Sequence, residues 1–275
     1  MNNMEKFSSL EKKPNSKDQE SEGLDKNKNL LVKNISKKEQ RFSPKIKNFE
    51  KFTLFFRLKG LIYLLKQDKK LKLLRFFIKK PIYHSFNLFK SYIQKKPYIK
   101  EEKDLFLFNL KSFNDFKNHL SNKNTLLIIG FSYCMKPKLC PKKRFSSDCI
   151  HDPNHPICST CFIGKCINSL PKEDLFLVIP DVYYISDKLT QIKKNHPDRE
   201  ILFVIMTCNL SIHMFADNAN MIKIKGLAIE ISGRICVNNK TFLLAEKGIK
   251  PGVTCLSYKN EDIVFKILNI RPKFF

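Results

Sequence analysis

Six of the nine cysteines in this 275-residue chain fall between Cys134 and Cys166, a pattern typical of thiolate chemistry. Cys158 and Cys161 have the CxxC spacing with which two thiolates bind one ion from a tight turn, and Cys166 follows five residues later. The surrounding stretch, residues 132–172, shows almost no periodic apolar pattern. A long loop without a hydrophobic face needs another source of folding energy, and metal–thiolate bonds supply it. We therefore predict a metal site here.

Other roles for these cysteines fit less well. Disulfides need an oxidising compartment, and the N-terminus MNNMEKFSSLEKK lacks the apolar core of a signal peptide. A thioredoxin-like pair belongs at a strand-to-helix turn, and inert cysteines belong in apolar surroundings rather than in a polar loop. The identity of the metal stays open. More than four cysteines favour an iron–sulfur cluster, whereas His151 and His155 could complete a zinc site.

The elements that position these thiols are apolar runs typical of buried parallel strands, at Thr125–Gly130, Leu175–Ile179 and Ile201–Met206. Cys134 follows the first run by four residues and Cys208 follows the third by two, so both should emerge at the carboxyl edge of the sheet, where open α/β sheets bind ligands. The candidate metal ligands are therefore Cys134, Cys140, Cys158, Cys161, Cys166 and Cys208. The roles of Cys149, Cys236 and Cys255 stay open.

The predicted fold class is α/β, a mostly parallel sheet flanked by helices and interrupted by a long cysteine-rich metal-binding loop. This domain spans residues 101–275. Leu105–Phe108 is a further candidate strand, Ser112 a helix cap, and Asp181 more typical of a cap than of a site. Three C-terminal segments also look strand-like: Met221–Ile231, Thr241–Leu244 and Asp262–Ile270.

The formal charge of +25 is concentrated ahead of this domain. Residues 1–50 are polar and predict a disordered tail. Residues 51–100 carry 14 basic and 1 acidic side chains and predict basic helices broken near Gly60 or Gln67 and at Pro81. In the last helix, apolar residues recur at helical spacing: Ile82, Phe86, Phe89 and Ile93. Residues 52–99 could dock on an anionic membrane, neutralise nucleic-acid phosphates, or pack on their own domain.

The order of motifs resembles a known family. A strand followed by SYCMKPKLCP, spaced cysteines ending in a CxxC, a second strand, a helix and a strand closing in MTC is similar to the prokaryotic cysteine-rich proteins of domain-of-unknown-function family 116. The resemblance covers roughly residues 105–257. It implies a cytoplasmic α/β protein that binds an iron–sulfur cluster or another metal, and it supplies no reaction. The spacing between Cys161 and Cys166 departs from that pattern, and Cys149 has no counterpart in it.

The leading hypothesis is an intracellular metal-binding protein with an iron–sulfur cluster in a redox or Lewis-acid role at the carboxyl edge. It would be cytoplasmic, with peripheral membrane attachment through the basic helices. The alternative is a non-catalytic module in which zinc staples the loop and the basic helices contact nucleic acid or an anionic membrane. Whether the protein is an enzyme stays undecided: a thiol nucleophile would need a base, and His213, five residues after Cys208, is poorly placed for it.

Overall fold

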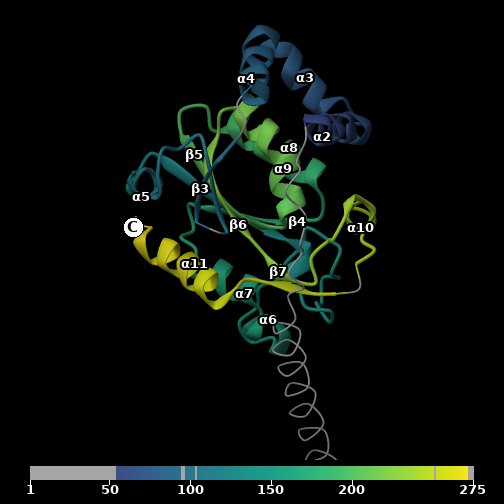
Figure 1. Cartoon of the computed structure of the whole chain (residues 1–275). Coiled ribbons are helices and arrows are strands. Elements are labelled where there is room, and N and C mark those ends of the chain that lie inside the picture. Colours follow the sequence, from purple (N-terminus) through teal and green to yellow (C-terminus); the bar gives the residue numbers. More distant parts are fainter. Residues whose placement is uncertain (1–53, 94–96, 103, 251, 272–275) are drawn as a thin grey trace, which may run out of the picture.

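A computed structural model describes residues 54–93, 97–102, 104–250 and 252–271 of the chain. Its centre is a six-stranded sheet in the order β1-β2-β6-β5-β3-β4 (Figure 1). Strands β6, β5, β3 and β4 run parallel, while β1 and β2 add an antiparallel edge. The bounds are β1 Ile99–Glu102, β2 Leu105–Phe108, β3 Thr125–Ser132, β4 Leu175–Ile179, β5 Glu200–Thr207 and β6 Lys225–Glu230. The predicted α/β class with a mostly parallel sheet is confirmed; the predicted tail, residues 1–50, lies outside the described residues.

Helices cover both faces of this sheet (Figure 1). Helices α8 (Val182–Asn195) and α9 (Asn209–Met221) pack on one face. The other face is covered by α5 (Phe113–Ser121), α7 (Phe162–Ser169) and α11 (Tyr258–Ile270). Because β3 and β5 are central and covered on both sides, nearly all their side chains are buried. This explains why these strands read as continuous apolar runs. Ser112 caps α5 as predicted, its hydroxyl accepting from Asp115 N at 3.2 Å.

The predicted C-terminal strands are largely wrong. Thr241–Leu244 lies in helix α10 (Asn239–Ala245), Asp262–Ile270 lies in α11, and only the second half of Met221–Ile231 forms a strand, β6. Both helices begin at side-chain caps that the apolar pattern hid: Asn238 forms a capping box on α10, and the Ser257 hydroxyl accepts from Asn260 N on α11. Between them, β7 (Ser232–Gly233) and β8 (Thr254–Cys255) form a separate two-stranded sheet.

Three N-terminal helices form an outer layer against α8 and α9 (Figure 1). They are α2 (Leu54–Gln67), α3 (Lys72–Lys79) and α4 (Pro81–Ile93), so the predicted breaks at Gln67 and Pro81 are present and Gly60 lies inside α2. Asp68 links the start of α3 to helix α8 of the domain. Its carboxylate accepts from Lys72 N at 2.8 Å and from the Tyr183 hydroxyl on α8 at 3.0 Å. No helix among the described residues is both long and apolar enough to span a bilayer.

Candidate functional site

The strand order creates a crevice at the carboxyl edge of the sheet. From β3 the chain proceeds to β4 on one side, and from β5 it proceeds to β6 on the other. The segments that follow β3 and β5 therefore diverge, and such a switch point is where open α/β sheets bind ligands. Cys134 lies in the short helix η1 (Tyr133–Met135) directly after β3, and Cys208 is the N-cap residue of α9 directly after β5. Both line one cavity of about 40 Å³ between the strand ends, called here the inner cavity.

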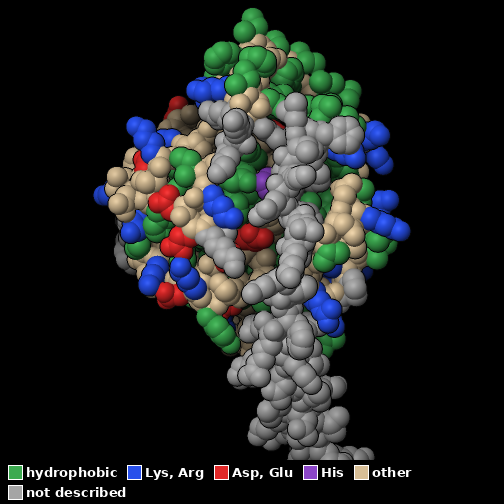
Figure 2. Space-filling view, viewed as in Figure 1, with side chains coloured by type: hydrophobic (Ala, Val, Ile, Leu, Met, Phe, Trp, Pro, Cys, Tyr) green, Lys and Arg blue, Asp and Glu red, His purple; other side chains and the backbone are tan. Residues whose placement is uncertain are grey.

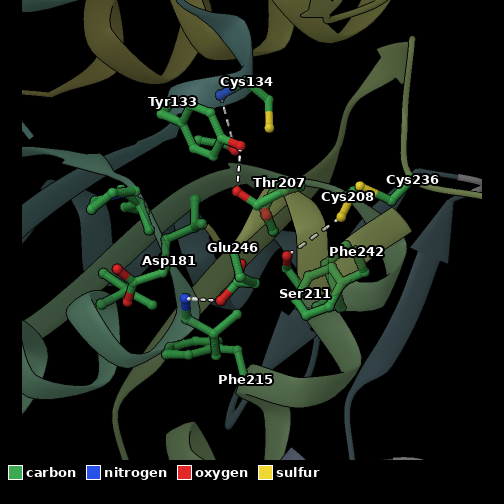
Figure 3. A pocket seen from close by; sticks show the side chains of 18 of the residues that line it. Tyr133, Cys134, Asp181, Thr207, Cys208, Ser211, Phe215, Cys236, Phe242 and Glu246 are labelled. Atoms are coloured by element: carbon green, nitrogen blue, oxygen red, sulfur yellow. Dashed lines mark hydrogen bonds between the residues drawn. The ribbon is translucent and has the colours of Figure 1, made fainter. Parts of the chain in front are cut away.

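A third thiol joins these two. Cys236 follows β7 and lines the same cavity, and Figure 3 shows it beside Cys208. We call Cys134, Cys208 and Cys236 the inner thiols; each is buried. Lys250 Nζ donates to Cys236 Sγ at 3.1 Å, and Cys208 Sγ lies 3.4 Å from the Ser211 hydroxyl. Burial, reinforced by Cys236, raises the pKa of Cys208 to about 12, so this thiol is protonated at neutral pH.

Two carboxyl groups line the inner cavity as well (Figure 3). Asp181 is the N-cap of α8, its carboxylate accepting from Tyr184 N at 2.6 Å, which is the capping role expected from sequence. Glu246 Oε2 accepts from Val182 N at 2.9 Å and from the Tyr63 hydroxyl at 3.2 Å. Burial raises the pKa of Glu246 to about 8, and burial also raises that of Asp181. At pH 7 the Glu246 carboxyl is therefore mostly neutral and can donate a proton.

The cysteine-rich loop forms a second group of thiols. A smaller cavity of about 10 Å³ is lined by four cysteines, here called the outer thiols: Cys140, Cys149, Cys158 and Cys161. Cys158 lies in the short helix α6 (Pro156–Thr160), and Cys161 both ends α6 and begins α7. Burial raises the pKa of Cys161 to about 11. The backbone N–H groups of Gly164 and Ile163 act to lower this pKa, and the neighbouring Cys149 and Cys140 act to raise it. The outer thiols are thus close enough to repel one another as thiolates.

Side-chain cations hold the first half of this loop. Lys136 is 1% exposed, and its ammonium donates to Lys143 O at 2.6 Å, Asp148 O at 2.9 Å and the Ser146 hydroxyl at 3.1 Å. The Arg144 guanidinium donates to Lys250 O at 2.7 Å and to Cys134 O at 3.1 Å. A buried ammonium that satisfies three acceptors fixes a chain segment without a hydrophobic face. The prediction from sequence gave this task to a metal alone and did not include Lys136 or Arg144.

The remaining candidates lie away from both cavities or are used otherwise. Cys166, a predicted ligand, is buried in the hydrophobic core, where burial raises its pKa, and it lines neither cavity. His155 caps α6 by accepting from Ile157 N at 3.2 Å. His151 adopts a left-handed backbone (φ 37°), with Nδ1 3.3 Å from Cys149 O. Cys255 Sγ lies 3.9 Å from the Ser232 hydroxyl in the small sheet.

The six predicted ligands therefore divide between two places. Cys134 and Cys208 line the inner cavity, Cys140, Cys158 and Cys161 the outer one, and Cys166 neither. Cys149 completes the outer thiols and Cys236 the inner ones, both of which the sequence left open. The position of Cys149 within the dense cysteine cluster was a usable signal that it belongs with the other outer thiols. Cys236 lies in a segment distant in sequence, and no local signal marked it. In the described part of the chain, no group of three or more His, Cys, Asp or Glu side chains is arranged as a site able to hold a metal ion.

The chain was compared with known families, curated proteins and solved structures. None of the three comparisons found a match. The resemblance to domain-of-unknown-function family 116 stays a prediction.

Proposed function

We propose that this protein binds a metal through the outer thiols Cys140, Cys149, Cys158 and Cys161. The observation that carries the proposal is that four cysteines from three parts of the loop line one small cavity. Four thiolates are the ligand set of closed structural zinc sites and also of iron–sulfur clusters. Closing the site requires the side chains to rotate toward one another about χ1, which for cysteine means moving between staggered rotamers.

The size of the cavity bears on which metal binds. About 10 Å³ corresponds to a single water-sized sphere. One tetrahedral zinc ion fits that space better than a cluster of several irons and sulfides, so the geometry favours the zinc alternative over the iron–sulfur cluster as occupant of the outer thiols. The metal would tie α6 and the start of α7 to the loop that crosses the carboxyl edge. Its role there would be structural, because four protein ligands leave no open position.

The redox or Lewis-acid role expected from the sequence is better supported at the inner cavity than at the outer thiols. This cavity is larger, contains three thiols, and has the neutral Glu246 carboxyl as a proton donor. Thiolates bind metals only while they are reduced, so the proposal places the protein in a reducing compartment, and the cytoplasm expected from the sequence is one.

The test is metal analysis of protein purified without oxygen, with a visible spectrum. We expect about one equivalent of zinc and no visible absorption; a brown protein with broad absorption would identify an iron–sulfur cluster instead. The variant Cys149→Ser/Cys161→Ser should lose the metal, while the control Cys255→Ser, outside both cavities, should keep it. Protein that contains neither zinc nor iron, or a double variant that retains its metal, would overturn the proposal.

A further inference from the structure

Helix α4 is turned the opposite way from an ordinary amphipathic helix of a globular domain. The apolar stripe predicted from sequence, Ile82, Phe86, Phe89 and Ile93, faces away from the protein, with 63% to 85% of each residue exposed. The buried side chains of α4 are polar, namely His84, Asn87 and Ser91. A helix normally buries its apolar stripe in the core, so this orientation needs a reason outside the described residues.

Specific hydrogen bonds hold α4 in this orientation against α9. The Asn87 amide donates to Met221 O at 3.2 Å. The Ser91 hydroxyl donates to Asp217 Oδ1 at 2.8 Å and accepts from Asn220 Nδ2 at 2.9 Å. Rotating α4 to bury its apolar stripe would break these buried hydrogen bonds to α9, which is costly. The outward apolar stripe is therefore built into the fold.

The exposed apolar surface extends over the neighbouring helices. Of the nineteen exposed large apolar side chains in the described residues, eleven lie between residues 58 and 93. Figure 2 shows apolar side chains gathered at the end of the molecule where α3 and α4 lie. Contiguous exposed apolar patches on a folded protein mark contact sites. We call this surface the apolar face; besides the α4 stripe it contains Leu58, Ile62, Leu65, Leu71, Leu74, Ile78 and Tyr83.

Basic side chains surround the apolar face. Residues 58–93 contain eight lysines and one arginine but a single acidic residue, the buried Asp68. Lys79 and Lys80 lie at the end of α3 and Lys90 lies in α4, all of them exposed. Lys193 and Lys223 add positive charge beside Lys80 on the adjoining surface. A broad apolar surface rimmed with positive charge complements the boundary between the headgroups and the acyl chains of an anionic bilayer.

We propose that the apolar face formed by α2, α3 and α4 docks this protein on an anionic lipid membrane. The apolar stripe of α4 enters the headgroup–acyl boundary, and the lysines around it contact acidic headgroups. The helices lie in the plane of the interface, because the opposite side of α4 is bound to α9. The proposal is independent of the metal, since the outer thiols lie on the loop at the carboxyl edge of the sheet.

The chain contains no tryptophan, so an introduced indole can be excited selectively, at wavelengths that its tyrosines do not absorb. Phe89→Trp places one indole in the apolar stripe, and Tyr258→Trp places one at the exposed start of α11, on the opposite face of the sheet, as the control. With vesicles of phosphatidylcholine containing about a fifth phosphatidylserine, the first variant should show blue-shifted emission that brominated lipids quench. The control should show neither effect. Unchanged emission from Phe89→Trp would overturn the proposal.

Vesicle co-sedimentation of the full chain tests the two contributions separately. Replacing all four residues of the α4 stripe by Gln should abolish binding, while four Gln substitutions at residues exposed elsewhere, Leu139, Val237, Ile249 and Ile270, should leave it unchanged. Each lysine strengthens binding roughly fivefold, so Lys79→Gln/Lys80→Gln/Lys90→Gln should weaken it about a hundredfold. High salt should weaken the wild type as well.

Other occupants of the apolar face give different results, each of which would overturn the proposal. Binding to a mixed-sequence oligonucleotide, but not to vesicles, would show a nucleic-acid surface. A dimer in sedimentation velocity that the four-Gln stripe variant dissociates would show a contact between two copies. Blue-shifted emission from Phe89→Trp before vesicles are added would show that another part of the chain covers the stripe. Metal content should be unchanged in all these variants, so failure here leaves the metal proposal standing.

Discussion

Replacing Glu246 by Gln should remove a specific part of the pH dependence of stability. In the folded protein, burial raises the pKa of Glu246 from its ordinary value near 4.5 to about 8. Below pH 4.5 the group is protonated both folded and unfolded. As the pH rises from 4.5 to 8, the unfolded chain ionises this carboxyl while the folded protein resists ionisation. The contribution of the group to stability is therefore fully present in acid and lost by about pH 8.

The magnitude follows from the acidity. Each pH unit over which only the unfolded chain ionises this carboxyl lowers the free energy of unfolding by about 1.4 kcal/mol. Between pH 6 and pH 8 this amounts to slightly less than two units, or about 2.3 kcal/mol. Partial contact of Glu246 with solvent screens the charge, so we expect about 1 to 2 kcal/mol. The Gln amide keeps an oxygen that can accept from Val182 N and from Tyr63.

The assay is urea unfolding at pH 6, 7 and 8 for the wild type and for Glu246→Gln, with Glu101→Gln as an exposed control. The free energy of unfolding of the wild type should fall relative to Glu246→Gln as the pH rises, whereas the control should follow the wild type. Cysteine ionisation in the unfolded chain also lowers stability with pH, but it is common to all three proteins and cancels in the comparison. Parallel pH profiles for the wild type and Glu246→Gln would refute the reasoning.

Three further substitutions test how the fold and the cysteine-rich loop are held together. Arg271 and Asp174 form a fully buried ion pair at 2.8 Å, so Arg271→Met should lower the free energy of urea unfolding by about 3 to 5 kcal/mol, and adding Asp174→Asn should recover part of it; additive losses would contradict the pairing. Lys136→Met should cost about 2 kcal/mol and open the loop before Cys149 to trypsin, whereas unchanged cleavage would show that the ammonium does not hold the loop. Ser91→Ala should cost about 1 to 2 kcal/mol and speed amide exchange in α4, and unaltered exchange would show that its bond to Asp217 does not anchor the helix.

Burial explains which parts of the fold were predictable. Three of the four parallel strands, β3, β4 and β5, were predicted from their apolar runs. The central strands β3 and β5 are covered on both faces, and the edge strand β4 is partly buried. Their order in the chain then placed Cys134 and Cys208 at the carboxyl edge, where both lie. The C-terminal segments gave no such signal. Ile263, Val264 and Ile267 are residue types common in strands. Their spacing of three and four residues is nevertheless helical, and the cap at Ser257 marks where the helix begins.

Periodicity also identified α4 but not the direction of its apolar stripe. Spacing along one helix shows that an apolar face exists, whereas the partner of the opposite face lies more than a hundred residues away, as in the contact between Ser91 and Asp217. The same limit applies to Cys236, which reaches the inner cavity from the segment after β7. Contacts between distant segments are set by topology, and no local pattern records them.

The cations Lys136 and Arg144 change what a metal would have to do in this loop. Their hydrogen bonds reach carbonyl groups between Cys134 and Asp148 and in the segment around Lys250, so the approach to the outer thiols is fixed by side chains alone. The half from Cys149 to Cys161 contains three of the four outer thiols, and the Asn168 amide on α7 donates to its His151 O at 3.0 Å. A metal on the outer thiols would order this second half and attach it to the half that the cations hold. Its effect on stability is therefore expected in the residues after Asp148.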